Sequence, residues 1–168
     1  MKPAAYWISK LQLAQHVEGG SYSRTYSSPL ILPLHQLPHQ FNGARPVATA
    51  IYFLLENGQF SAMHRIASDK MWHFYYGDPL VIYEIDPAGN LAEQLLGSNP
   101  EKNENFQCVV KAGSWFGSRI KQGGNYSLVG CTVSPGFDFE DFEMGRRSVL
   151  TTLYPQHGDI ITMLTRED

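Results

Sequence analysis

Short segments rich in valine, isoleucine, tyrosine, phenylalanine and threonine follow one another from about residue 19 to residue 136, separated by glycine, proline and asparagine. β-Branched and aromatic residues favour strands, and the separating residues favour turns. We therefore predict strands over Ser21–Ser27, Pro46–Glu56, Phe60–Ile66, Met71–Tyr76, Leu80–Ile85, Leu91–Leu96, Phe106–Val110, Trp115–Ile120 and Tyr126–Val133. Many short strands at this spacing, with no helices between them, are typical of a β-sandwich or β-barrel.

Two connections stand out among these segments. Asn57-Gly58 predicts a tight two-residue hairpin turn, because both residues can adopt a positive φ. Pro29–Arg45 is the longest segment without a strand pattern, and connections of that length are commonly functional or mobile.

Apolar residues recur at helical spacing near both ends of the chain. Ala4, Ile8 and Leu11 predict a short N-terminal helix. The same spacing between residues 146 and 164, interrupted at Pro155, predicts two short C-terminal helices that pack on the β-core.

The strand and helix patterns predict one domain over residues 1–168, with the barrel from about 19 to 136 and the helical tail from about 146 to 164. The composition agrees with a compact domain. The chain is 43% hydrophobic, 12% aromatic and 17% charged, the opposite of the balance in disordered proteins. Its formal net charge of -3 argues against a nucleic-acid partner, which would call for a basic surplus.

The sequence also argues against a membrane or secreted protein. The longest apolar stretch, Val47–Leu55, is about half the ~20 residues that a membrane helix needs. The first residues lack the apolar region of a signal peptide, and Cys108 and Cys131 are too few for a disulfide scaffold. We therefore expect a soluble, cytoplasmic protein.

The segment Gly58–Gly77 has the spacing of a metal-binding motif without its ligands. It resembles the first motif of cupins, in which a glycine precedes His-x-His, a glutamate and a second glycine. His64 stands at the first histidine position, but Ile66 and Lys70 stand where the second histidine and the glutamate would be. In the second cupin motif, Phe116 replaces the remaining histidine. One imidazole cannot hold a divalent ion without further ligands, so we expect no metal and no other cofactor.

Three blocks narrow the resemblance. His16–Gly20, Ser68–Tyr75 and Gly130–Phe139 resemble, in this order, motifs of one cupin family of uncharacterised function, the cupin-5-like proteins. The resemblance implies a double-stranded β-helix barrel (a jelly roll) with a pocket in its mouth, a homodimer, and no assigned reaction. The chain departs from the family pattern at Val17, Arg24 and Lys70, where the family has proline, glutamate and glutamate.

Strand periodicity groups the polar candidates. His64 and Ile66 share one face of their predicted strand, as Lys70, Trp72 and Phe74 share one face of theirs. His64 is either an acid or base in an aromatic cavity or a core histidine bonded to a backbone carbonyl. Lys70 is either a pocket cation for a carboxylate or phosphate or a strand-end lysine that reaches solvent.

Aromatic and amide side chains supply the candidate walls. A barrel of this size cannot fill its mouth completely, so some of its aromatics line a cavity rather than the core. The candidates are Trp72, Phe74, Tyr52, Tyr83 and Trp115. Gln107 lies in an otherwise apolar strand and is either a ligand contact or a core amide with a partner.

These residues support two functions. The first is a protein that binds a small polar metabolite without a metal, in which His64 and Gln107 orient the ligand. The alternative is a metal-independent isomerase or epimerase acting on a sugar or an acidic metabolite. In that enzyme His64 is the base, Lys70 stabilises the resulting anion, and Tyr52 or Tyr83 returns the proton.

Overall fold

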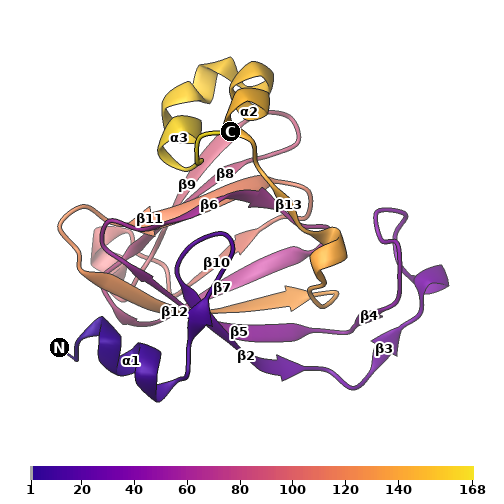
Figure 1. Cartoon of the computed structure of the whole chain (residues 1–168), viewed down its shortest axis with the longest axis horizontal. Helices are drawn as coiled ribbons and strands as arrows, with labels where there is room; N and C mark the ends of the chain where they lie inside the picture. Colours follow the sequence, from indigo (N-terminus) through magenta and orange to yellow (C-terminus); the bar gives the residue numbers. More distant parts are fainter. Residues whose placement is uncertain (1) are drawn as a thin grey trace.

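Two antiparallel sheets packed face to face form the body of the protein in the computed structural model, which describes residues 2–168 (Figure 1). The first sheet has six strands, in the order β1 (Ala14–Gln15), β2 (Ser21–Ser27), β5 (Thr49–Glu56), β12 (Tyr126–Ser134), β7 (Asp69–Gly77) and β10 (Gln107–Val110). The second has five strands, in the order β13 (Glu143–Met144), β6 (Phe60–Arg65), β11 (Trp115–Ile120), β8 (Leu80–Ile85) and β9 (Leu91–Leu96). The chain alternates between these sheets, which is the predicted double-stranded β-helix.

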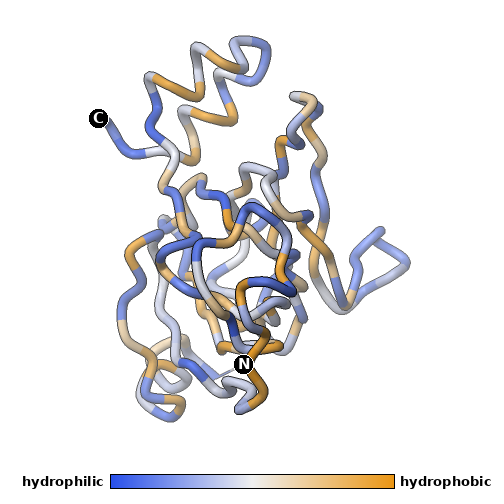
Figure 2. Tube along the Cα trace, turned by 90° about the vertical axis from the view of Figure 1, so that its right-hand side faces the viewer, coloured by the Kyte–Doolittle hydropathy of each residue, from blue (hydrophilic) through white to orange (hydrophobic). Residues whose placement is uncertain are grey.

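The predicted strands are confirmed, with small differences at their ends. The exception is the predicted strand Pro46–Glu56, which is divided into β4 (Arg45–Pro46) and β5. Its first part belongs to a separate two-stranded sheet with β3 (Ile31–Leu32). Along the strands the chain changes between apolar and polar residues over short distances, as the colours of Figure 2 show.

The predicted hairpin at Asn57-Gly58 is wrong. Gly58 has a φ of 84°, but Asn57 is not among the residues with positive φ. The flanking strands do not pair with each other: β5 lies between β2 and β12, and β6 lies between β13 and β11. The turn therefore carries the chain from one sheet to the other.

The main core lies between the sheets and takes large apolar side chains from both. Its buried members are Phe53, Leu55, Ile66, Trp72, Leu80, Ile82, Leu96, Cys108, Val110, Phe116, Ile120, Val129, Cys131 and Val133. Side chains that alternate with these along the strands point to the outer faces of the sheets. Both outer faces are partly covered by helices.

The predicted helices are confirmed and cover one face each. Helix α1 (Ala4–Lys10) packs on the outer face of the first sheet, against Leu54 and Leu128. Helices α2 (Arg147–Leu153) and α3 (Gly158–Met163), joined by the 3₁₀ turn η4 (Pro155–His157), pack on the outer face of the second sheet. None of the helices in residues 2–168 is long and apolar enough to cross a membrane.

The long predicted loop is an arm that extends from the barrel. Residues 28–47 contain β3, the 3₁₀ turn η1 (Leu34–Gln36) and β4, and Figure 1 shows them beyond the end of β2 and β5. Two further 3₁₀ turns, η2 (Pro100–Lys102) and η3 (Phe139–Asp141), lie in other connections.

Candidate functional site

A pocket with a cavity of about 40 Å³ opens between the two sheets, beside β2 and the segment 135–142. Its polar lining comprises His16, Glu18, Tyr22, Arg24, Thr49, His64 and Lys70. Its apolar lining comprises Ile51, Ile66, Cys131, Val133, Phe137 and Phe139. Burial raises the pKa of the Cys131 thiol to about 12, so this cysteine is a neutral part of the wall.

The turn before β2 places Glu18 inside the barrel. Gly19 has a φ of 109° and Gly20 a φ of 71°, backbone conformations that other residues rarely adopt. A Cβ at Gly19 would lie 2.2 Å from the carbonyl oxygen of Phe60 on β6, so this close approach also requires glycine. The carbonyl of Glu18 accepts a hydrogen bond from the backbone N–H of Ala62 at 2.7 Å. The turn is thereby fixed to β6, the strand that carries His64.

Glu18 is 3% exposed and contacts three polar side chains. Its Oε1 accepts a hydrogen bond from the Ser61 hydroxyl at 2.9 Å. Its Oε2 lies 3.1 Å from Nε2 of His64 and 3.5 Å from Nδ1 of His16. Burial raises the pKa of this carboxyl, but His64, Lys70, His16 and Ser61 together outweigh it and lower the pKa to about 2. Glu18 is therefore a carboxylate at neutral pH.

His64 is held between two acceptors. Its Nδ1 lies 2.7 Å from the carbonyl oxygen of Ala62, and its Nε2 faces Glu18. Its ring stacks on Phe142, with centroids 5.2 Å apart, and contacts Phe116, with centroids 4.1 Å apart. The core alternative is present, since His64 is bonded to a backbone carbonyl, and His64 also lines the pocket, while its role as an acid or base stays a prediction.

The neutral ring of His64 has one proton, although an acceptor faces each of its two nitrogen atoms. Burial lowers its pKa to about 4, although the Glu18 carboxylate and the Ala62 carbonyl act in the opposite direction. A neutral imidazole carries one N–H, so one ring nitrogen of His64 faces an acceptor without a proton between them. Uptake of a proton would complete both hydrogen bonds.

His16 forms the outer side of this cluster. Its Nδ1 accepts a hydrogen bond from the backbone N–H of Glu18 at 3.3 Å, and its ring lies edge-on to Tyr22 at 4.5 Å between centroids. Burial lowers the pKa of His16, and Lys70 lowers it further, whereas Glu18 raises it.

Lys70 is a buried cation that faces the pocket. It is 6% exposed, and its Nζ lies 4.4 Å from the ring centroid of Trp72 and 5.1 Å from that of Phe116. Among residues 2–168 it makes no hydrogen bond and no ion pair through this Nζ. Lys70 lines the pocket as the predicted cation would, its Nζ is not among the completely buried polar atoms without a partner, and its binding role stays a prediction.

The wall formed by residues 135–142 is attached to the arm. Phe137 and Phe139 line the pocket, and their rings contact each other with centroids 5.0 Å apart. Arg45 of β4, 2% exposed, donates to both carboxylate oxygens of Asp141 at 2.7 and 2.8 Å. The hydrogen bonds and charge of Asp141 raise the pKa of Arg45 above its ordinary value. This buried ion pair fixes the wall to the arm.

The other predicted site residues fall into two groups. Trp72 is fully buried behind Lys70, and Phe74 packs half-buried against the main core, so both share the predicted face without lining the cavity. Tyr52 points the other way: its neighbour Ile51 lines the pocket, and side chains alternate along a strand. Tyr52 therefore packs towards α1, away from His64.

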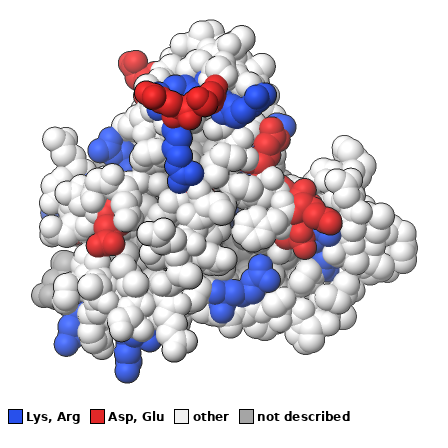
Figure 3. Space-filling view, in the orientation of Figure 1, with Lys and Arg blue, Asp and Glu red and all other residues white. Residues whose placement is uncertain are grey.

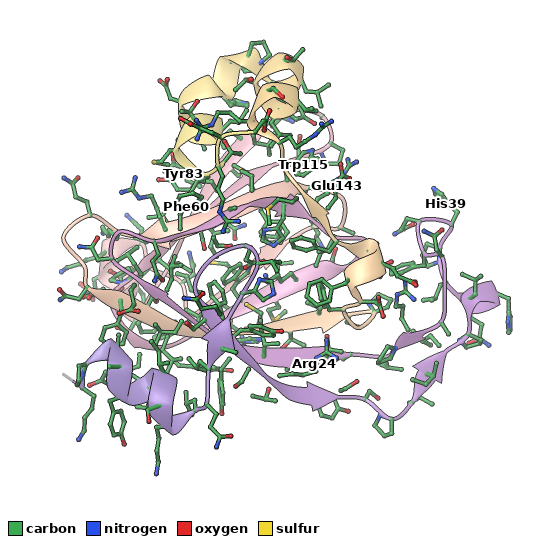
Figure 4. The ribbon with its side chains drawn as sticks, viewed as in Figure 1. Arg24, His39, Phe60, Tyr83, Trp115 and Glu143 are labelled. Carbon is green, nitrogen blue, oxygen red and sulfur yellow. The ribbon has the colours of Figure 1, made fainter. Side chains whose placement is uncertain are left out.

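Tyr83, Trp115 and Gln107 also lie outside the pocket. Tyr83 and Trp115 belong to the apolar cluster under α2 and α3, and Figure 4 shows both near these helices, far from Arg24 on β2. Gln107 is exposed, and its side-chain nitrogen lies 3.0 Å from Nδ1 of His73 on the outer face of the first sheet. The sequence pattern did not reveal which face of these strands the helices cover.

Sequence reasoning missed most of the polar lining of the pocket. His16, Glu18 and Tyr22 come from β2 and the turn before it, and they meet His64 only through the fold. A signal was present, because the block His16–Gly20 combines two titratable residues with two glycines at positive φ. It contributed to the family resemblance but not to the predicted site.

The residues at the cupin metal positions do not fit a metal ion. Ile66 and Phe116 offer no ligand atom, and Lys70 places an ammonium where a carboxylate would be needed. Within residues 2–168 no group of three or more histidine, cysteine, aspartate or glutamate side chains is arranged to hold a metal.

Comparison with known proteins agrees with the observed architecture. A family model described as "Cupin superfamily (DUF985)" matches residues 5–145. A crystal structure of a protein from Shewanella oneidensis is 41% identical in sequence, with both chains covered to 100% and a TM-score of 0.88. A hypothetical protein from Leishmania major is 36% identical, with 99% of this chain and 100% of that chain covered and a TM-score of 0.91. A cupin 2 domain-containing protein from Halorhodospira halophila shares 12% identity over 92% of this chain and 88% of its own, at a TM-score of 0.57, which shows the fold alone.

Proposed function

The chain belongs to the Cupin_5 (DUF985) family of the cupin superfamily, and on that premise we propose that it binds a small polar metabolite, without a metal ion, in the pocket between its sheets. One observation carries the proposal: the buried groups of Glu18, His64 and Lys70 converge on a cavity that is otherwise walled by apolar side chains. Concave apolar sites with a few converging polar groups are the usual form of small-molecule sites.

The polar groups are arranged to orient a ligand rather than to fill the core. Glu18 and His64 hold each other in place, and Ser61 and Ala62 fix both from β6. Charged and polar groups are seldom buried to this extent unless they are paired or used. Charged side chains are sparse even on the surface, where Figure 3 shows them only in scattered groups on the visible face. Several charged and titratable groups inside one pocket are therefore unusual for this chain.

A thermal-shift screen tests the proposal. We expect one or more compounds among nucleotide sugars, amino acids and oxo acids to raise the melting temperature of the protein and to be recovered unchanged. Ile51 lines the pocket and Tyr52 faces away from it, so Ile51→Phe should abolish the shift and Tyr52→Phe should preserve it. A shift that survives Ile51→Phe, or a screen without a binding compound, would count against the proposal.

A second function, a metal-independent isomerase or epimerase, is favoured by the placement of His64 and Lys70 on the same cavity. In this reaction His64 removes a proton from a carbon next to a carbonyl, Lys70 stabilises the oxygen anion of the enolate, and the proton returns to the same carbon. Tyr52 and Tyr83 do not line the pocket, whereas Tyr22 does, so Tyr22 replaces them as the candidate tyrosine.

Deuterium exchange separates the two functions. The enzyme would incorporate deuterium from D₂O into a bound metabolite, and His64→Gln would abolish this exchange. A metabolite that binds and stays unlabelled would support the binding function and contradict the isomerase function.

The homodimer stays a prediction, and we propose the arm as its interface. Leu30, Ile31 and Leu34 are between 47% and 65% exposed on it. Apolar side chains clustered on one projecting segment are typical of a contact between proteins. Light scattering should give twice the chain mass of 18.9 kDa, and Leu30→Ser with Ile31→Ser should reduce it to one.

A further inference from the structure

We infer that the ligand of this pocket is a small monocarboxylate with a short apolar chain, and that its carboxylate binds Lys70. The inference rests on the proposed binding function and adds the chemical class of the ligand. It starts from the one buried cation among residues 2–168 that lacks a partner of opposite charge.

Lys70 differs from the other buried cation and from a surface lysine. Arg45 is as deeply buried, but it is paired with Asp141. Lys111 is exposed, and its Nζ lies 2.8 Å from Asp69. Within residues 2–168, Nζ of Lys70 lies over the faces of Trp72 and Phe116 and forms no ion pair, and a ring face cannot replace the hydrogen bonds of an ammonium group.

The nearest carboxylate does not complete the site. Glu18 is engaged by Ser61 and His64, and it lies outside ion-pair distance of Lys70. Lys70 and Arg24 contribute two positive charges to the lining, and Glu18 contributes one negative charge. The pocket therefore keeps one net positive charge while His16 and His64 are neutral, and a ligand with a single negative charge would balance it.

The strand register places a second polar group beside Lys70. Val133 of β12 pairs with Lys70 of β7 on one side and with Thr49 of β5 on the other. These three side chains form one row across the sheet, and all three line the pocket. Thr49 is 2% exposed and its oxygen accepts a hydrogen bond from the backbone N–H of Phe137, which leaves its O–H free to donate.

This row is suited to the two oxygens of a carboxylate. Neighbouring strands are about 4.8 Å apart, so the strands of Lys70 and Thr49 are roughly 10 Å apart, and a ligand carboxylate would lie over Val133 between the two side chains. Ile51 and Ile66 supply apolar walls for the rest of the ligand, and Arg24 lies at the outer side on β2 (Figure 4). A cavity of about 40 Å³ limits the buried part of the ligand to a few atoms.

Isothermal titration with three matched probes tests the inference. 3-Methylbutanoate carries the carboxylate, 3-methylbutanamide is its neutral equivalent, and 2-methylpropyl phosphate carries the alternative oxyanion on the same branched chain. We expect the carboxylate to bind at least tenfold more tightly than the amide, and more tightly than the phosphate. Equal affinities for carboxylate and amide, or a preference for phosphate, would overturn the inference.

Variants identify the group that carries the effect. Lys70→Gln and Lys70→Met should weaken 3-methylbutanoate at least tenfold and leave the amide unchanged, and Lys70→Arg should retain most of the affinity. Lys102→Gln, at an exposed position of η2, is the matched control and should change nothing. Melting curves show that each variant is folded, and two different replacements of Lys70 guard against the failure of one.

The outcomes separate this inference from the function on which it rests. If neutral polar compounds bind and Ile51→Phe prevents it, while carboxylates do not bind, the pocket function stands and the carboxylate class is wrong. If no compound of either kind binds, the pocket function itself fails.

Discussion

Nε2 of His64 lies 3.1 Å from Oε2 of Glu18 in the interior of the barrel. The Ala62 carbonyl faces the other ring nitrogen, and Lys70 and His16 are the remaining charged and titratable groups near this pair. A neutral imidazole has one N–H, so only one of these two contacts can be a hydrogen bond at a time. The protonation of this pair decides both the acid stability of the fold and the chemistry open to a ligand.

We predict that acid destabilises the protein through His64. The unfolded histidine binds its proton near pH 6.5, whereas burial holds the folded pKa at about 4, so the unfolded chain binds more protons between these values. The resulting stability is fully present above pH 6.5 and is lost as the pH falls to about 4. The melting temperature should fall by roughly 5–10 °C over this window.

Glu18 extends the same trend to lower pH. Its folded pKa of about 2 lies below the ordinary 4.5, so its contribution is present above pH 4.5 and is lost towards pH 2. His64→Gln should flatten the curve between pH 6.5 and 4, and His35→Gln, at an exposed position of η1, should not. A wild-type melting temperature that rises on acidification would show that His64 is protonated in the folded state.

Removal of the Glu18 carboxylate should be costly. Glu18→Ala leaves the Ser61 hydroxyl and Nε2 of His64 without the acceptor that both face. Leaving buried hydrogen-bonding groups without a partner costs about 1–3 kcal/mol, which urea denaturation monitored by circular dichroism can measure. Glu143→Ala is the control, because Glu143 pairs with Arg65 at the surface and should cost at most about 1 kcal/mol.

The Arg45–Asp141 pair should contribute far more than a surface pair. Its two side chains are 3% and 4% exposed, whereas those of Lys111 and Asp69 are 72% and 45% exposed. Asp141→Ala should destabilise the fold by up to about 3–5 kcal/mol, because it leaves the buried guanidinium with the longer contact to the exposed Glu140 carboxylate and the Ala44 carbonyl. Asp69→Ala is the comparison at the surface. It removes the ion pair with Lys111, which should contribute about 0–1 kcal/mol to stability. It also removes the acceptor of the backbone N–H of Ala112, which adds a separate cost. Double-mutant cycles on the two pairs would contradict this expectation if their coupling energies were equal.

Two glycines allow backbone strain to be separated from close packing. Gly19 and Gly58 both have positive φ, but a Cβ at Gly19 would meet the Phe60 carbonyl, whereas nothing lies within 4 Å of a Cβ at Gly58. Gly58→Ala should cost about 1–2 kcal/mol from conformation alone. Gly19→Ala should cost more and should also displace Glu18, which would weaken ligand binding. Similar losses at both positions would show that contact with Phe60 is unimportant.

Much of the fold could be predicted from the sequence because strand signals are local. Alternating apolar residues and intervening turn residues indicated the longer strands but not the two-residue strands β1, β3 and β13, and the helices at both ends followed from spacing. The break between β4 and β5 could not be predicted, since it depends on the pairing of β4 with β3 inside the arm. The hairpin prediction at Asn57-Gly58 was wrong for the same reason, because tertiary packing decides which strands pair.

The candidate site was predictable only in part. Periodicity placed His64 and Lys70 on inward faces, and the structure brings both to the pocket. Periodicity could not show which alternate residues of β5 face inward, because Ile51 and Tyr52 are both apolar enough for a core. In the structure Ile51 faces the pocket and Tyr52 faces α1. Glu18 was missed because its role arises from a turn that contacts a strand distant in sequence.

The ion pair between Arg45 and Asp141 has a consequence for how a ligand enters. Lifting the wall of residues 135–142 away from the barrel would separate a guanidinium that is almost fully desolvated from the carboxylate that holds it. We therefore expect the wall to act as a fixed boundary and not as a moving lid. Ligand exchange should proceed past Arg24 and Tyr22 at a rate set by diffusion through a standing aperture, without a slow conformational step.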